Sequence, residues 1–183
     1  FLRKLKQFFK YIYRFTFRNE KLNVFEKNSE TLISKVYLIN LDKKKDRLNR
    51  FNKEIRRLKL HNGISLGNFY ERFSAIDGKN LDLNISDEFV AKKYPLTAQY
   101  YVDPDPRLLD IIKNKNIDVE LFPEEIAVAI SHINIWQKIV EEKISYTLIL
   151  EDDVFFEKYF SEKLNDLWDE LVTREKDGYK FDI

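Results

Sequence analysis

Three consecutive carboxylates, Glu151, Asp152 and Asp153, directly follow a short apolar run at residues 146–150. A run this short and rich in branched side chains predicts a strand that is buried on both faces. Ligands of open α/β sheets bind just beyond the carboxyl ends of such strands. Adjacent carboxylates repel one another unless a cation binds them, and a divalent cation with oxygen ligands can also carry a diphosphate. We therefore predict a metal–diphosphate site here; the alternative is a charged loop at a sheet edge.

A second group of candidate residues follows an earlier apolar run, at residues 35–41. Asn40 lies at the end of that run, and Arg47 lies shortly after it. Both could contact the base, ribose or phosphates of a nucleotide, since arginine suits phosphate geometry. The alternative, which composition alone favours, is a helix start with a solvated basic face.

Two further pairs of residues depend on their surroundings for a function. Ser131 and His132 lie inside an apolar stretch that predicts a helix over residues 123–142. A buried, hydrogen-bonded histidine is the ordinary interpretation, and a mid-helix serine is a poor nucleophile. On a helix beside the acidic strand, however, this pair would line a donor pocket. Asp77 and Gly78 would place a backbone turn at the rim of that pocket, or form an ordinary β-turn.

The apolar periodicity predicts the elements that position these residues. The strand at 35–41 is followed by a helix, which Asp42 would cap, with apolar residues at steps of three and four over 48–58. Residues 68–76 alternate and predict a second strand, so that strand, helix and strand form a βαβ unit.

Three later segments have a less regular pattern of apolar residues. An amphipathic helix is predicted over residues 161–171, and residues 179–183 are typical of the start of another strand. Residues 81–122 carry loop chemistry and indicate an insertion near the sheet edge, with short helices at 86–92 and 107–113.

Composition excludes several classes of protein. The 183 residues include 44% hydrophobic and 15% aromatic residues, which is typical of a folded domain with a real core. A net charge of +1 gives no global field for nucleic acid, so no nucleic-acid partner is predicted. The absence of cysteine excludes disulfides and thiolate metal sites. The glycines never form G-x-G-x-x-G or a P-loop, which argues against classical dinucleotide-binding and P-loop NTPase folds.

The N-terminal segment differs in composition from the rest of the chain. Over residues 1–21, lysines and arginines outnumber the single acidic residue, Glu20. Apolar, largely aromatic residues recur there at near-helical spacing. Such a basic amphipathic helix can lie in a membrane interface; the alternative is a helix that packs on its own domain or on a second subunit of a homo-oligomer. Residues 23–34 indicate a polar linker, so residues 1–34 are predicted to be separate from a domain over 35–183.

Four stretches, in this order along the chain, resemble glycosyltransferase family 25, the lipooligosaccharide-type galactosyltransferases and their collagen-modifying relatives. The matching residues are Val36–Asp42 with Arg47, Phe73–Gly78, Glu125 with Ser131, His132 and Trp136, and Leu148–Val154. Their joint order is specific, although the chain has Glu124 where the family usually has glycine.

The resemblance implies an α/β, GT-A-like fold over residues 35–183, with a Rossmann-type mixed sheet flanked by helices. It implies Mn²⁺ or Mg²⁺ held at Glu151, Asp152 and Asp153, and a UDP-sugar donor contacted by Asn40, Arg47, Asp77, Gly78, Ser131 and His132. The implied reaction is a metal-dependent, inverting transfer of a hexose, galactose first of all, to a hydroxyl of a lipooligosaccharide or another glycan. No catalytic base is identified. Because the family continues well beyond Ile183, we expect the chain to be C-terminally truncated.

The expected setting is the cytoplasm, with peripheral contact at the inner face of the membrane through residues 1–21, in lipopolysaccharide biosynthesis. An alternative is a catalytically silent, glycosyltransferase-like module for binding or assembly, motivated by the short C-terminal part and the basic N-terminal helix. A third interpretation, a Mg²⁺ phosphotransfer domain, needs a lysine or threonine after later strands and leaves the matches at Asn40 and Asp77 unexplained.

Overall fold

The computed structural model describes residues 21–27, 29–82 and 90–179. The chain divides into two compact units: the larger unit combines the chain up to Phe73 with the chain from Ile139 onward, and the smaller unit is Ser74–Lys138. The helix predicted within residues 1–21 and the strand predicted from Tyr179 lie outside the described residues, apart from Lys21 and Tyr179 themselves.

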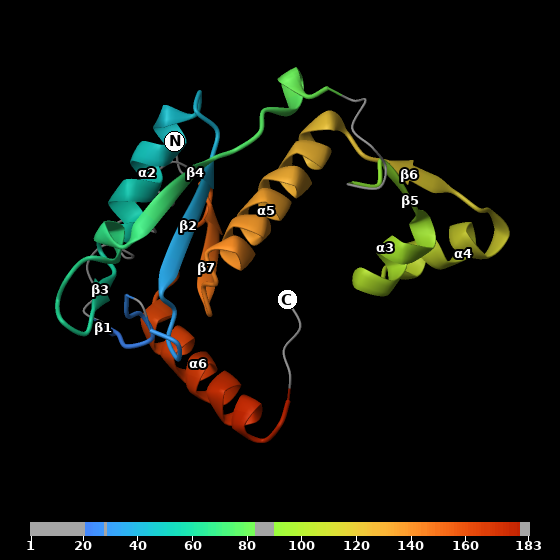
Figure 1. Ribbon diagram of the computed structural model, residues 1–183. Coiled ribbons are helices and arrows are strands. Elements are labelled where there is room, and N and C mark those ends of the chain that lie inside the picture. The colour runs from blue at the N-terminus through green and yellow to red at the C-terminus, as the bar shows by residue number, and fades with distance from the viewer. Residues whose placement is uncertain (1–20, 28, 83–89, 180–183) are drawn as a thin grey trace, which may run out of the picture. The chain divides into compact units, whose positions relative to one another are not determined.

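The larger unit is built on a three-stranded sheet. β2 (Lys35–Asn40) lies between β4 (Tyr70–Ser74) and β7 (Thr147–Glu151), in the order β4-β2-β7 (Figure 1). β2 and β7 are parallel, with Ile39 opposite Glu151, so their carboxyl ends lie at the same edge of the sheet. β2 is buried after its first residue, whereas the apolar residues of β7 are only half-buried. β7 is therefore less enclosed than the sequence predicted, since it ends the strand order on one side.

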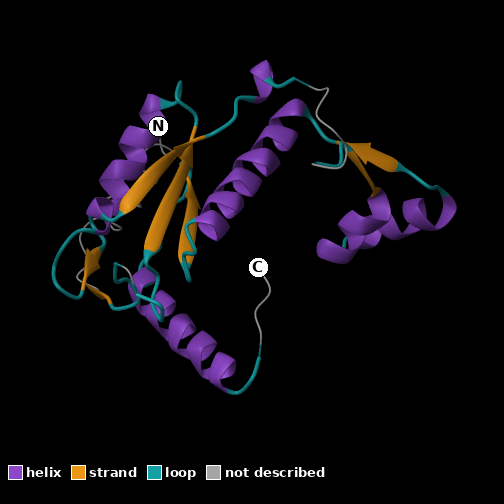
Figure 2. Cartoon of the chain, in the orientation of Figure 1, coloured by secondary structure: helices purple, strands orange, loops and turns teal. Residues whose placement is uncertain are grey.

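α2 (Lys45–Ile55) packs beside this sheet through its apolar face (Figure 2). Phe51 and Ile55 are buried, and the Phe51 ring meets the Tyr70 ring of β4 edge-on, with 5.4 Å between centroids. The strand–helix–strand pattern predicted from the sequence is thus confirmed. α6 (Phe160–Lys176) confirms the other amphipathic helix and extends beyond its predicted C-terminal end.

The prediction that Asp42 caps α2 is wrong. α2 begins after Lys44, whose side chain makes no capping hydrogen bond. The backbone N–H of Lys44 donates to the Leu41 carbonyl at 2.9 Å, so the chain turns once before the helix starts. Asp42 instead accepts a hydrogen bond from Arg72 of β4.

The polar linker predicted over residues 23–34 is packed into the core of the larger unit. β1 (Lys21–Leu22) pairs in parallel with β3 (Lys59–Leu60). Val24, Phe25 and Ile33 are buried. Apolar residues occur in this segment only as two short pairs, at 24–25 and 32–33, which form no regular apolar period that would reveal a core segment.

The smaller unit contains a strand pair and two short helices. β5 (Lys93–Pro95) pairs antiparallel with β6 (Asp118–Glu120), and α3 (Leu96–Val102) and α4 (Pro106–Asn114) lie between them in sequence. α4 confirms the helix predicted over 107–113, whereas the sequence did not predict α3, β5 or β6. These elements are short, and α3 contains no buried residue, so no strong apolar period marks them.

Two further helices were predicted in this part of the chain, over residues 86–92 and from Pro123 onward. The helix predicted over 86–92 lies partly outside the described residues, and residues 90–92 are not helical. α5 (Pro123–Glu141) confirms the long helix predicted from its proline and its acidic first turn. The Glu125 carboxylate accepts the backbone N–H of Phe122 at 2.7 Å, which satisfies a donor at the helix start. Within the described ranges, no helix has the length and apolar character needed to cross a membrane.

Candidate functional site

The parallel register of β2 and β7 brings Asn40 beside Asp152. The Asn40 Nδ2 atom donates to Asp152 Oδ2 at 2.6 Å and to the Lys44 carbonyl at 3.3 Å. Asn40 is 2% exposed and Asp152 is 6% exposed. An amide and a carboxylate are stable at such depth only when they are hydrogen-bonded, and each of these two groups satisfies the other.

Arg47, in the first turn of α2, reaches the same carboxylate. Its Nη1 atom donates to Asp152 Oδ1 at 3.0 Å, so the two oxygens of Asp152 bond to two different donors. The hydrogen bond to Asp152 raises the pKa of the Arg47 guanidinium above its ordinary value, and the negative charges of Asp152 and Asp153 act in the same direction. The Arg47 side chain is 42% exposed, so it carries a positive charge to the surface at this strand end.

Arg72 on β4 completes this arrangement, although the sequence interpretation had not singled it out. Its Nε atom donates to Asn40 Oδ1 at 2.9 Å, and its Nη2 atom donates to the Asn40 carbonyl at 3.1 Å. Nη2 also donates to Asp42. Asn40, Arg47, Arg72 and Asp152 are here called the strand-end network. The available signal was a basic residue on the strand expected to neighbour the first strand, but alternation alone gives such a residue no special weight.

The acidic triplet divides into one buried and two exposed residues. Asp152 is buried, whereas Glu151 and Asp153 are exposed, and the backbone N–H of Val154 donates to the Glu151 carbonyl at 3.3 Å in the turn that follows β7. Among the residues that the structure describes, no three or more His, Cys, Asp or Glu side chains are grouped to hold a metal ion. The triplet therefore does not form a three-carboxylate cage, because Asp152 faces inward.

The fit to a divalent cation consequently depends on the two exposed acids. Mg²⁺-type ions usually bind one or two carboxylates and complete their coordination with water and substrate phosphates. Asp153 and Glu151 match that requirement in type and exposure, while both Asp152 oxygens bond to Asn40 and Arg47. Of the acidic triplet, Asp153 and Glu151 are therefore the two residues whose type and exposure suit a cation that binds few protein ligands.

The remaining candidates lie in the smaller unit, on α5 and in the segment at residues 76–78 that contacts it. Ser131 is fully buried; its hydroxyl donates to the Ala127 carbonyl at 2.7 Å and accepts the Ile76 backbone N–H at 3.0 Å. A Cβ atom at Gly78 would lie 2.6 Å from the Glu124 Cα atom, so only glycine fits there. Residues 76–78 and the α5 residues that they touch are here called the turn–helix junction.

Asp77 and His132 have more peripheral places beside this junction. An Asp77 carboxylate oxygen accepts the Lys79 backbone N–H at 3.2 Å and so caps the short 3₁₀ helix Gly78–Asn80. His132 is half-buried, and its ring centroid lies 6.2 Å from that of Trp136. The predicted site residues therefore form two groups: Asn40 and Arg47 with the acidic triplet in the larger unit, and Asp77, Gly78, Ser131 and His132 in the smaller unit.

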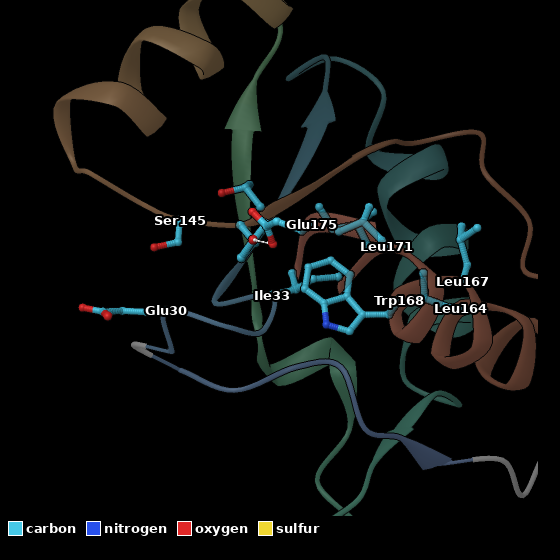
Figure 3. Close-up of a pocket in the computed structure, with 11 residues that line it drawn as sticks. Glu30, Ile33, Ser145, Leu164, Leu167, Trp168, Leu171 and Glu175 are labelled. Atoms are coloured by element: carbon cyan, nitrogen blue, oxygen red, sulfur yellow. Dashed lines mark hydrogen bonds between the residues drawn. The ribbon is translucent and has the colours of Figure 1, made fainter. Parts of the chain in front are cut away.

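A separate pocket of about 630 Å³ lies between the amino end of β7 and α6 in the larger unit (Figure 3). Leu164, Trp168 and Leu171 of α6 give it an apolar wall. At its rim, the Tyr146 hydroxyl donates to a Glu175 carboxylate oxygen at 2.8 Å. No candidate site residue lines this pocket. The acidic triplet lies at the opposite, carboxyl end of β7.

Comparisons with known proteins agree with the resemblance drawn from the motifs. A sequence model of glycosyltransferase family 25, described as an LPS biosynthesis protein, matches residues 33–179. A glycosyltransferase 25 family member of Aedes aegypti is 28% identical over 138 residues, which cover 75% of this chain and 19% of that protein. Procollagen galactosyltransferase 1-A of Xenopus laevis is 29% identical over 143 residues, covering 78% of this chain and 20% of that protein.

A third relative matches a similar part of the chain. A glycosyltransferase 25 family member of Anopheles gambiae is 30% identical over 131 residues, covering 70% of this chain and 18% of that protein. The chain thus spans about a fifth of the length of the curated relatives that it matches. No solved structure gives a significant match.

Proposed function

Because this chain belongs to glycosyltransferase family 25, we propose that it binds a UDP-sugar and takes part in transferring the hexose to a hydroxyl of a glycan. Galactose is the first candidate sugar, since several relatives carry the name procollagen galactosyltransferase. The observation that carries the proposal is the strand-end network, which holds Arg47 beyond the carboxyl ends of two parallel strands. That edge is where open α/β sheets bind their ligands.

Arg47 is the residue that we propose for contact with the donor diphosphate. Its Nη1 atom is bonded to Asp152, and its other donors have no protein partner among the described residues. A planar guanidinium with donors to spare suits bidentate binding of a phosphate. To Asn40 the proposal assigns a supporting role, since its amide donates to Asp152 and accepts from Arg72.

Asp153 and Glu151 would hold the divalent cation, Mn²⁺ or Mg²⁺, together with the diphosphate. When bound, such an ion neutralises the charge that develops on a departing diphosphate. In the proposed inverting transfer, an acceptor hydroxyl oxygen bonds to the anomeric carbon from the face opposite UDP. The bond from that carbon to the diphosphate oxygen breaks, UDP leaves with the electron pair, and a base that we do not assign removes the hydroxyl proton.

We extend the proposal to the acceptor and to the setting of the protein. The description of the family as an LPS biosynthesis protein supports a lipooligosaccharide or another bacterial-type glycan as acceptor. Work on such an acceptor fits a cytoplasmic protein with peripheral membrane contact through residues 1–21. Flotation with anionic liposomes tests this contact: deleting residues 1–21 should abolish co-flotation, and equal flotation without them would reject it.

Calorimetric titration with UDP tests the nucleotide-sugar site directly. The wild-type protein should bind UDP with Mn²⁺ and bind it more weakly in EDTA. Asp153→Asn should lower the Mn²⁺-dependent affinity by about tenfold or more, since even outer partners of a metal contribute that much. Asp169→Asn, an exposed acid on α6, is the matched control and should bind as the wild type does.

Two outcomes would contradict parts of this proposal. Equal UDP binding by the wild type and Asp153→Asn would reject the cation site at the acidic triplet. UDP binding without any hydrolysis or transfer of UDP-galactose would favour the alternative, a silent module for binding or assembly. Sedimentation of the same samples would establish whether the chain forms a homo-oligomer.

A further inference from the structure

We propose that Arg72 is a positioning residue, which fixes the direction of Arg47 toward the donor diphosphate through Asn40 and Asp152. The inference rests on the proposed function, because it assigns a role within the same site. Its basis is a continuous chain of hydrogen bonds that joins β4, β2, the turn after β7 and α2.

The first step is the contact between Arg72 and Asn40. Arg72 donates with Nε to the side-chain oxygen of Asn40 and with Nη2 to its main-chain oxygen, at 2.9 and 3.1 Å. A guanidinium carries donors only, so it accepts no hydrogen bond from an amide nitrogen. Arg72 therefore anchors the Asn40 oxygen on the β4 side, while Asp152 and the Lys44 carbonyl accept from the Asn40 nitrogen.

The second step is the occupation of one Asp152 oxygen. Asn40 Nδ2 lies 2.6 Å from Asp152 Oδ2, which leaves Oδ1 for Arg47. Arginine and carboxylate groups readily form pairs with two parallel hydrogen bonds when both oxygens are available. With Oδ2 occupied by Asn40, Arg47 binds Asp152 through Nη1 alone, and its remaining donors stay available for a ligand.

The consequence is that Arg72 affects the site without touching the ligand. If Arg72 is replaced, the Asn40 side-chain oxygen loses the donor that anchors it on the β4 side, and the amide can shift away from Asp152. Asp152 Oδ2 then loses its donor, and Arg47 turns onto both carboxylate oxygens. The Arg47 donors that would bind the diphosphate then bond to Asp152 instead, while the rest of the nucleotide site is unchanged.

A comparison of UDP with uridine tests this inference, because only UDP carries the diphosphate. Arg72→Gln should weaken UDP binding by about tenfold, the size of a coupling within one hydrogen-bonded network, and leave uridine binding unchanged. In an Arg47→Gln background, Arg72→Gln should cause no further loss, since its effect passes through Arg47. Arg174→Gln removes an exposed ion pair with Glu170 on α6 and serves as the matched control with wild-type affinity.

Arg72→Lys covers the case in which Arg72→Gln does not fold. Lysine keeps the charge but cannot make the forked contact with Asn40, so it should show the same selective loss of UDP over uridine. Equal losses for UDP and uridine, or losses at Arg47 and Arg72 that multiply in the double variant, would overturn the inference alone. An absence of UDP binding by the wild-type protein would overturn the proposed function, and this inference with it.

Discussion

The strand-end network and the turn–helix junction contain the two groups of predicted site residues, and they use their polar groups differently. In the network, buried Asn40 and Asp152 support Arg47, which remains 42% exposed and charged. In the junction, both hydrogen-bonding functions of Ser131 are satisfied internally, and Gly78 is needed for a close backbone approach. Under the proposed function, residues of one family pattern divide into those that hold the backbone and those that present charge to a ligand. The first class should affect stability and the second should affect binding.

Replacing Asn40 by alanine should cause the largest loss of stability. The change removes hydrogen bonds to Asp152, Lys44 and Arg72 and leaves the buried Asp152 with one donor fewer. We expect the free energy of unfolding to fall by roughly 3 kcal/mol, since hydrogen bonds to charged groups contribute most. Urea unfolding would measure it, with Asn116→Ala, at an exposed position, as control. A loss no larger than that of the control would place Asn40 outside the structural class.

Replacing Gly78 by alanine should have the next largest effect. The added Cβ would lie 2.6 Å from the Glu124 Cα atom, so the backbone must shift. Overpacking of this kind costs about 1–3 kcal/mol, and we expect a value near the upper end because the neighbour is backbone. Gly63→Ala is the matched comparison: it meets no atom within 4 Å but has φ +81°, so strain alone should cost less. Equal thermal shifts for the two variants would contradict the close approach at Gly78.

Replacing Ser131 by alanine should have an intermediate effect. The half-buried N–H of Ile76 would lose its acceptor, which costs about 1–2 kcal/mol because no other partner replaces it. Chemical denaturation of Ser131→Ala beside Ser145→Ala, an exposed serine, would measure the difference. If Ser131→Ala instead left stability intact and selectively weakened UDP binding, the junction would belong with the residues that face the ligand.

The smallest effect on stability should come from Asp153→Asn. Asp153 is exposed, and exposed substitutions away from special features usually change stability by less than about 0.5 kcal/mol. The free energy of unfolding should therefore stay near that of the wild type, although Mn²⁺-dependent UDP binding falls. A large loss of stability without added metal would show that Asp153, like Asp152, supports the fold.

The sequence predicted the main elements of the larger unit because burial enforces a regular apolar period there. Such patterns predict the strand at 35–40, its parallel partner at 147–151 and the helix at 45–55. The short elements α3, β5 and β6 lack buried residues or carry few, so no period marked them. The packing of residues 23–34 was missed for a similar reason, since two short pairs of apolar residues form no regular period.

For the candidate site, the sequence predicted proximity but not direction. Parallel strands with polar carboxyl ends were enough to place Asn40, Arg47 and the acidic triplet at one edge. Whether a side chain faces inward depends on its partners, and Arg72, a decisive partner of Asn40, lies on another strand with no motif of its own. The sequence could not predict that Asp152 is buried and Asp153 is exposed, because the two residues are adjacent and chemically identical.

The long sequence separation within the strand-end network has a consequence for the order of folding. Asn40 and Asp152 are 112 residues apart. The backbone N–H of Asn23, directly after β1, donates to the Asn165 side chain of α6, which is 142 residues away. The amide of Asn40 therefore has no carboxylate partner until the chain has been synthesised through β7. Closing such distant contacts is slow, because the loop entropy is lost before the contacts form. We expect β2 to gain protection from hydrogen exchange only together with β7, so that pulse labelling during refolding would find both strands protected in one late step.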